Sequence, residues 1–245
     1  MKDTKRIFHT DAAYFRYRIP GMVVTARGTV LLYCEARTTQ SDWARMDILL
    51  YRSEDGGESF DGPIVIARGT DEYRTVNNPV CIVDDETLHL LYCRDYSIRG
   101  GNVFHRTSAD DGRTWSSPVD IMASTMPEFH NAFAIGPGHG IRTAQGTLLT
   151  PVWMVPRSCG MPIESHNPAV VSTLYSRDHG KTWHLGELLP ATDTVPDPNE
   201  SMAAVLPDGR IYMNVRTTGA GFRARSCSKT GTDGWDALTL DRGMI

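Results

Sequence analysis

Ser176-Arg-Asp-His-Gly-Lys-Thr-Trp183 is one of three copies of an eight-residue pattern in this 245-residue chain, and the other two are Ser53-Glu-Asp-Gly-Gly-Glu-Ser-Phe60 and Ser108-Ala-Asp-Asp-Gly-Arg-Thr-Trp115. All three fit Ser-x-Asp-x-Gly-x-(Ser/Thr)-aromatic. We expect the Asp to accept hydrogen bonds from backbone N–H groups just ahead of it, and the Gly to take the positive φ that closes the turn. The aromatic residue should lie between neighbouring strands. The pattern carries no catalytic chemistry, so what it predicts is a chain of repeated β units.

The spacing of these turns predicts a β-propeller. The first two copies begin 55 residues apart and the next two 68 residues apart, which suits units of the size of a four-stranded blade. No amphipathic helix is found, and short β-rich runs lie between Gly, Pro and Asp residues. A fourth unit ends in a degenerate turn at 228–235. We therefore expect an all-β fold in a single domain over 1–245, with strands near 28–34, 47–52, 87–93, 146–153, 201–206 and 210–215.

The composition is typical of a globular protein that has one substantial core. The chain is 40% hydrophobic and 22% charged, with a formal net charge of −4. This balance gives no electrostatic reason to expect nucleic acid or an anionic membrane as a partner. No apolar run reaches the roughly 18 residues of a membrane span. The N-terminal sequence lacks the apolar stretch of a signal peptide, which favours a cytoplasmic location.

The cysteines and histidines predict neither a disulfide framework nor a metal site. The five cysteines are odd in number and form no Cys-x-x-Cys pair, and the eight histidines are scattered. We expect Cys34, Cys81 and Cys93, which lie in apolar runs, to be buried free thiols. We expect no metal and no other cofactor.

The first candidate for chemistry is Arg18, at the start of a predicted strand in Tyr17-Arg-Ile-Pro20. An arginine in apolar surroundings needs a carboxylate. That carboxylate can belong to the protein or to a ligand, which the planar guanidinium can hold through two hydrogen bonds. The motif alone leaves both possibilities open.

A second candidate region begins where the strand that contains Glu35 and Arg37 ends and a loop begins. Loops at one end of a propeller converge on its central channel, so Asp42 in this loop is a candidate, although a loop Asp often only forms a turn. Asp47 begins the next apolar strand. We expect it to be a structural partner of the backbone or of Arg45.

Further along the chain lie Thr75-Val-Asn-Asn-Pro79, Gly136-Pro-Gly-His-Gly140, Glu200 in a loop and Arg216 at a strand end. Each has an ordinary structural explanation by itself. Together with the Tyr17–Pro20 motif, Asp42 and the three turns, however, their order along the chain resembles the sialidase (neuraminidase) family of exo-acting glycosidases. The resemblance runs from about Arg6 to the end of the chain. It implies a six-bladed β-propeller, and the eight-residue turns are then Asp-box turns.

The resemblance implies a pocket for sialic acid, a sugar with a carboxylate on its anomeric carbon. Arg18 and Arg216 match two members of an arginine triad that binds this carboxylate. Arg37, oriented by Glu35, would lie near O4 of the ring, with Asn78 on the same wall. Trp153 would line the region of the glycerol tail. The implied partners are sialylated glycoproteins, glycolipids and oligosaccharides.

The resemblance also assigns the reaction. Asp42 matches the acid/base that protonates the leaving oxygen and then deprotonates water, and for this we expect it to be partly shielded from solvent. Glu200 matches the carboxylate that activates a tyrosine nucleophile, and the product keeps its configuration.

The sequence departs from the family pattern in two respects. The third triad arginine and the nucleophilic tyrosine have no counterpart, and six blades would need about 350 residues. Arg223 and Arg225 follow Arg216 too closely, and Tyr212 has no route to the anomeric carbon. We therefore expect about four blades of an incomplete propeller and little turnover by this chain. The alternatives are a hydrolase for another acidic sugar and a non-catalytic glycan-binding or scaffold propeller.

Overall fold

The computed structural model describes residues 5–10, 12–94, 102–121, 129–156 and 168–244, with the side chains of 129–133 excepted, and these residues form strands and no α-helix. Nowhere in these ranges is there a helix that could cross a membrane. The strands are β1 (Arg16–Val24), β2 (Val30–Arg37), β3 (Met46–Ser53), β4 (Asp61–Arg68), β5 (Val76–Asp84), β6 (Thr87–Arg94), β7 (Asn102–Ser108), β8 (Val119–Asp120), β9 (Phe129–Ile135), β10 (Gly138–His139), β11 (Ile141–Arg142), β12 (Leu148–Pro156), β13 (Val170–Ser176), β14 (His184–Leu185), β15 (Pro198–Val205), β16 (Ile211–Thr217), β17 (Arg223–Ser228) and β18 (Thr239–Asp241).

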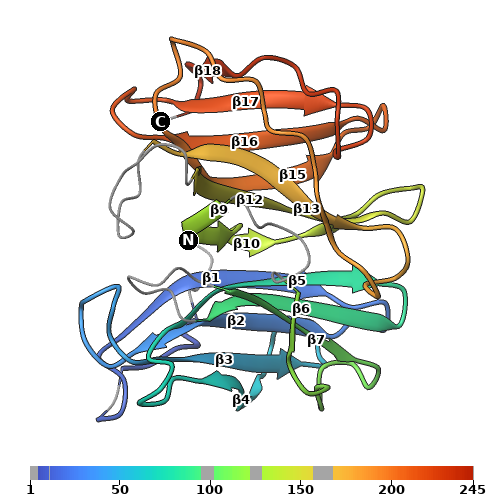
Figure 1. The fold of residues 1–245 in the computed structure, drawn as a ribbon. Helices are drawn as coiled ribbons and strands as arrows, with labels where there is room; N and C mark the ends of the chain where they lie inside the picture. Colours follow the sequence, from blue (N-terminus) through green and yellow to red (C-terminus); the bar gives the residue numbers. More distant parts are fainter. Residues whose placement is uncertain (1–4, 11, 95–101, 122–128, 157–167, 245) are drawn as a thin grey trace.

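The strands form four sheets that lie face to face in chain order, which we call blades 1 to 4 (Figure 1). Blade 1 has the order β1-β2-β3-β4, and blade 4 has the order β15-β16-β17-β18. Blade 2 has the order β10-β5-β6-β7-β8, in which β10 comes from later in the chain and pairs in parallel with β5. Blade 3 has the order β11-β12-β13-β14, with β9 also paired to β12. This architecture agrees with the all-β, four-blade expectation.

The core lies between the blades, because successive side chains of a strand point to opposite faces of its sheet. On β6, Leu90 and Tyr92 pack toward blade 1, whereas Leu91 and Cys93 belong to the cluster that blade 2 shares with blades 3 and 4. A strand covered on both faces needs apolar residues at nearly every position. This explains the unbroken apolar run that ends at Cys93.

The three Asp-box turns form the hydrogen bonds expected from their sequence. In each, the Asp accepts a bond from the backbone N–H four residues later and from the hydroxyls of the first and seventh residues. Bonds from Thr114 lower the pKa of Asp110 to about 2, and equivalent bonds hold the pKa of Asp55 and Asp178 below the usual range. The backbone bonds are Ser59 N to Asp55 (2.9 Å), Thr114 N to Asp110 (2.8 Å) and Thr182 N to Asp178 (2.9 Å).

Two of the turns also join neighbouring blades through their fourth residue. Asp111 and His179 occupy this position with φ of 63° and 57°. Arg52 of blade 1 donates from Nε to the Asp111 carbonyl at 3.0 Å. His179 Nδ1 lies 2.7 Å from Oδ2 of Asp84 in blade 2. Each of these turns therefore fixes its own blade to the preceding one.

The degenerate turn of blade 4 lies in the same position relative to blade 3. Thr230 stands where the other turns have Asp, and Ser228 Oγ accepts a hydrogen bond from Gly231 N at 2.9 Å. Arg177 of blade 3 donates to Thr232 Oγ1 at 3.1 Å. The turn keeps its contact with the preceding blade although the Asp is replaced.

Asp47 is structural, as expected, but Arg45 is not its partner. Asp47 accepts hydrogen bonds from Gly69 N (3.0 Å), Arg68 (3.2 Å) and the Tyr14 hydroxyl (2.7 Å). The reason is the register of β3 and β4, which places Asp47 directly opposite Arg68.

Cys34, Cys81 and Cys93 are buried and none of them forms a disulfide, as expected. Burial raises the pKa of Cys81 and Cys93 to about 12. Cys227 is free and half-buried, and Cys159 lies outside the described residues.

Candidate functional site

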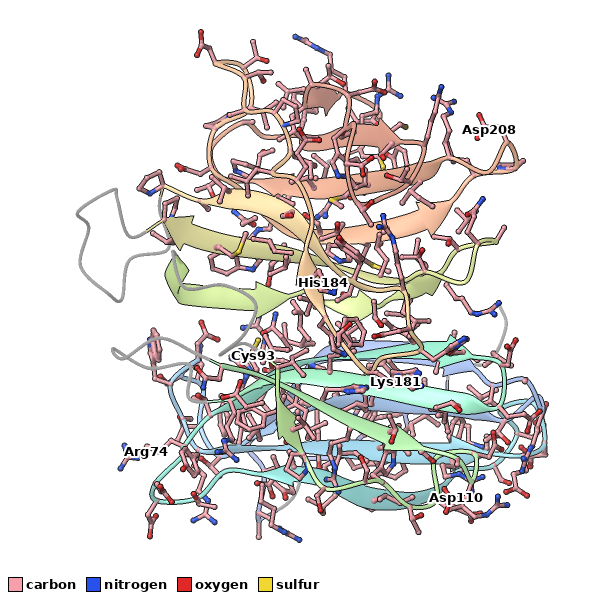
Figure 2. The ribbon with its side chains drawn as sticks, turned by 45° about the vertical axis from the view of Figure 1, so that its right-hand side comes forward. Arg74, Cys93, Asp110, Lys181, His184 and Asp208 are labelled. Atoms are coloured by element: carbon pink, nitrogen blue, oxygen red, sulfur yellow. The ribbon has the colours of Figure 1, made fainter. Side chains whose placement is uncertain are left out.

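A cavity of about 850 Å³ opens among the four blades at the end of the sheets opposite the Asp-box turns. In Figure 2, Asp110 and Lys181 mark the turn end, whereas Arg74 and Cys93 lie at the other end, where β6 finishes and β5 begins. The cavity is lined by Tyr17, Arg18, Ile19, Pro20, Arg37, Asp42, Asn77, Asn78, Ala134, Pro137, Gly138, Trp153, Asn199, Glu200, Met202, Arg216 and Thr218.

Irregular pairing places several of these residues. The register shifts between Arg18 and Gly21 on β1, between Asn77 and Val80 on β5, and between Pro198 and Ser201 on β15. Such irregularities re-aim side chains and are frequent beside functional sites. Ile19 and Asn78 lie within two of these segments at φ of 53° and 50°, a strained backbone for a non-glycine residue.

A chain of charged groups from blade 1 forms one wall. Glu35 is fully buried and accepts hydrogen bonds from Arg37 Nε at 2.8 Å and Nη2 at 2.5 Å. Arg37 also pairs with Asp42. Although burial opposes it, pairing with Glu35 and Asp42 raises the pKa of Arg37. The guanidinium is therefore charged and held by two carboxylates.

Arg18 and Asp42 lie on the solvent side of this wall. Arg18 Nη1 is 3.5 Å from Asp42 Oδ1, and the Asp42 side chain is 60% exposed. Arg18 is itself about half exposed, so its surroundings are more polar than its sequence context indicated. The expected shielding of Asp42 is not found either, because its loop is open to solvent at the mouth of the cavity.

Blade 4 supplies a second ion pair at the cavity. Arg216 Nη1 donates to Glu200 Oε2 at 2.7 Å, and the Arg216 side chain is more than half exposed. Behind this pair, Arg223 donates to Asn214 and, at 3.4 Å, to the Glu200 carbonyl. Burial, with a contribution from Arg216, lowers the pKa of Arg223.

Asn78 and Trp153 line the cavity from blades 2 and 3. The Asn78 N–H donates to Glu35 Oε1 at 2.8 Å, and its side-chain amide donates to the Ile135 carbonyl at 3.2 Å. Through these two hydrogen bonds, Asn78 joins the charged Glu35 of blade 1 to Ile135 of blade 3. Trp153 is nearly buried on β12.

The floor of the cavity is the Gly136–Gly140 segment, which is held by blades 1 and 4. The Tyr33 hydroxyl of blade 1 donates to the Gly138 carbonyl at 2.6 Å and accepts from Cys81 N at 3.1 Å. Ser201 N of blade 4 donates to the Gly136 carbonyl at 2.9 Å. Gly21 packs so tightly here that a Cβ would lie 2.1 Å from the Tyr33 ring.

The structure brings the predicted site residues together. Seven of them line the cavity, and Glu35 lies behind Arg37. Arg223, Arg225 and Tyr212 do not line it. The sequence interpretation missed Tyr17, Asn77, Asn199, Met202 and Thr218, although Asn77 and Asn199 adjoin the predicted Asn78 and Glu200.

This arrangement suits an anionic, polyhydroxylated ligand. Three guanidinium groups, those of Arg18, Arg37 and Arg216, line the cavity. The two exposed ones lie on the first and the last blade, Arg18 on blade 1 and Arg216 on blade 4. Two carboxylates, of Asp42 and Glu200, share the cavity and can accept or donate protons. Among the described residues, no group of His, Cys, Asp and Glu has the arrangement of a metal site.

Comparisons with known proteins give a consistent result. The BNR repeat-like domain matches residues 61–242. A sialidase of Paraclostridium sordellii is 28% identical over 92% of this chain and 58% of that protein. A sialidase of Micromonospora viridifaciens is 30% identical over 93% of this chain and 37% of that protein. The structure of the Hadza microbial sialidase Hz136 matches with a TM-score of 0.78 at 23% identity, over 94% of this chain and 48% of that one. The chain thus spans less than two thirds of each of them.

Proposed function

The chain belongs to the BNR repeat-like domain family, and on this premise we propose that its cavity is the sugar site of an exo-α-sialidase, a glycoside hydrolase that removes terminal sialic acid from glycoconjugates. Its four blades have the fold of the sialidase β-propellers. We further propose that residues 1–245 form one domain, since the core and the turns join each described blade to the next.

One observation carries this proposal: Arg18, Arg37 and Arg216 meet Asp42 and Glu200 in a single cavity. Arg18 and Arg216 bind the sugar carboxylate through charge-assisted hydrogen bonds. In the free protein the same two guanidinium groups contact Asp42 and Glu200. The ligand carboxylate therefore enters a site whose cations are already oriented.

In the complete reaction, Asp42 is the acid/base and Glu200 activates a tyrosine nucleophile, so that configuration is retained. Arg37, held by Glu35, binds the ring near O4, Asn78 supports this wall, and Trp153 lines the region of the glycerol tail. The 245-residue chain by itself binds the sugar with little or no turnover. The reason is that the tyrosine and the third arginine required by the resemblance have no counterpart in it.

Binding by the 245-residue chain tests the proposal. Isothermal titration calorimetry with the methyl α-glycoside of N-acetylneuraminic acid should show binding, and its uncharged methyl ester should bind at least about 10-fold more weakly. Arg18→Met and Arg216→Met should each weaken binding of the acid by about 10- to 100-fold. Arg210→Met is the matched control, because Arg210 precedes the same strand as Arg216 but pairs with Asp208 at the turn end.

The absence of binding, or an equal loss in Arg210→Met, would overturn the proposal. Methyl β-glucuronide distinguishes the alternative of another acidic sugar: tighter binding of this glycoside than of the sialoside would favour that substrate class.

A further inference from the structure

Arg223 is a half-buried cation at the start of β17 that the proposed mechanism does not use, and it lies beside the cavity rather than in its lining. Strand β17 pairs with β16, which carries Arg216, and β16 pairs with β15, which carries Glu200 (Figure 1). A guanidinium group stays charged at neutral pH, and its burial costs free energy unless acceptors surround it. The acceptors of Arg223 therefore indicate what this residue does.

The acceptors of Arg223 lie next to the ion pair of Glu200 and Arg216. Its Nη2 donates to the backbone carbonyl of Glu200 at 3.4 Å, and its Nε donates to the side chain of Asn214, two residues before Arg216 on β16. Burial lowers the pKa of Arg223, and Glu200 opposes this effect. A planar guanidinium can hold two acceptors in fixed relative positions. Arg223 therefore joins the strand of Glu200 to the strand of Arg216.

Glu200 needs such support because the regular strand pairing is interrupted around it. The register of β15 and β16 shifts between Pro198 and Ser201. In this interval, the Glu200 N–H donates to the Asn199 side chain at 2.9 Å, and the Ser201 hydroxyl donates to the Asn199 carbonyl at 2.6 Å. An irregularity of this kind re-aims a side chain. Side chains thus hold the backbone of this interval, and Arg223 holds the Glu200 carbonyl.

The carboxylate of Glu200 in turn orients Arg216. Arg216 Nη1 donates to Glu200 Oε2 at 2.7 Å, although the Arg216 side chain is more than half exposed. A long side chain that rotates freely loses conformational entropy when a ligand orders it, and this loss weakens binding. Because Glu200 already holds Arg216 in the unliganded protein, less entropy remains to be lost when a carboxylate binds there.

We propose that Arg223 is a positioning residue: by bonding the Glu200 carbonyl and Asn214, it holds the Glu200 carboxylate where it orients Arg216 toward the carboxylate of a bound sugar. This inference rests on the proposed function and adds to it a residue outside the cavity. The effect of Arg223 on binding passes through the side chain of Glu200. Removal of that side chain should therefore cancel the effect of a substitution at Arg223.

A double-mutant cycle tests this coupling by calorimetric binding of the methyl α-glycoside of N-acetylneuraminic acid to the 245-residue chain. Arg223→Met should weaken binding of this acid by about 10-fold, because the ligand then has to order Arg216. In the Glu200→Ala background, the same substitution should change the affinity by no more than about 2-fold. The methyl ester of the sialoside has no charge to pair with Arg216, so Arg223→Met and the wild type should bind it with nearly the same affinity.

Arg225→Met is the matched control. Arg225 lies two residues further along β17, so it faces the same side of the sheet as Arg223, and it is exposed. Its substitution removes an equal charge while the bonds of Arg223 remain, and should leave the affinity for the acid within about 2-fold of the wild type.

Arg223→Lys separates charge from geometry. It keeps the charge but lacks the planar fork that holds two acceptors, and should still bind the acid at least about 5-fold more weakly than the wild type. The same cycle with Arg223→Lys serves if Arg223→Met does not fold.

Four outcomes would overturn the inference. In the first, Arg223→Met binds the acid as the wild type does. In the second, it weakens binding equally with and without the Glu200 side chain. In the third, Arg225→Met weakens binding as much as Arg223→Met. In the fourth, Arg223→Lys binds the acid as tightly as the wild type, so that charge alone is sufficient. These outcomes leave the proposed function intact, whereas equal binding of the acid and the ester by the wild type would overturn both.

Discussion

His89 Nδ1 lies 2.9 Å from His105 Nε2, and the two imidazole rings are nearly parallel within the interface between blades 2 and 3. Burial, and the proximity of His89, lower the pKa of His105 to about 3. Burial also lowers the pKa of His89, although Asp84 opposes this effect. Asp84 in turn holds His179 of the next Asp-box turn. The interface therefore contains a pair of neutral imidazoles.

This pair predicts a loss of stability in mild acid. Because both pKa values are lower in the folded protein than the usual 6.5, the folded state excludes protons that the unfolded chain binds. The pair therefore does not lower the free energy of unfolding above about pH 6.5. This free energy decreases as the pH falls from there toward the pKa values of the folded protein. Between pH 6 and 5 the free energy of unfolding should fall by about 1.4 kcal/mol per pH unit through His105, and His89 should add to this slope, as measured by urea unfolding.

His105→Gln removes the imidazole whose pKa falls to about 3 and should clearly reduce this slope. His184→Gln is the control, because His184 is exposed on β14 (Figure 2). A slope that is the same in His105→Gln and the wild type would show that the pair does not cause the acid sensitivity.

The Asp-box turns should differ in their contribution to stability. Asp178→Ala removes the bonds from Ser176 and Thr182 and loosens the turn that carries His179 to Asp84. It should lower the unfolding temperature by roughly 3–6 °C, as measured by circular dichroism.

Asp55→Ala breaks the equivalent bonds in the turn of blade 1, where the fourth residue is Gly56 and nothing lies within 4 Å of the position a Cβ would take. Asp55→Ala should lower the unfolding temperature by less than half as much as Asp178→Ala does. Equal effects at the two turns would contradict the idea that contact with the preceding blade makes the difference.

Tyr33→Phe should disturb the cavity floor more than its small change in volume suggests. The substitution leaves the Gly138 carbonyl and the Cys81 N–H without their partner inside the core. We expect a loss of about 1–3 kcal/mol in the free energy of unfolding, measured in urea. Tyr212→Phe removes a hydroxyl that accepts a 3.5 Å contact from Asn214, and should be nearly neutral. A neutral Tyr33→Phe would show that the floor does not depend on this hydroxyl.

The sequence predicted those features that short patterns determine. The Asp-box turns and most of the strands follow from local residue preferences. The order of Arg18, Arg37 and Glu200 in the chain predicted that they share a site, and they line one cavity. Contacts across blades were not predictable, because they depend on registers that no local pattern specifies. The bonds of the Tyr33 hydroxyl are of this kind. Within blade 1, the pairing of Asp47 with Arg68 depends in the same way on strand register. Asn77 was overlooked because only packing distinguishes it from Asn78.

The turns and the cavity occupy opposite ends of the blades, and this separation has a practical use. A short peptide handle inserted at Gly56 would extend into solvent from the first turn. This turn lies at the end of blade 1 opposite to Arg37. Coupled through such a handle to a bead or a sensor chip, the chain would present its cavity outward, so that the proposed sugar binding could be measured from solution.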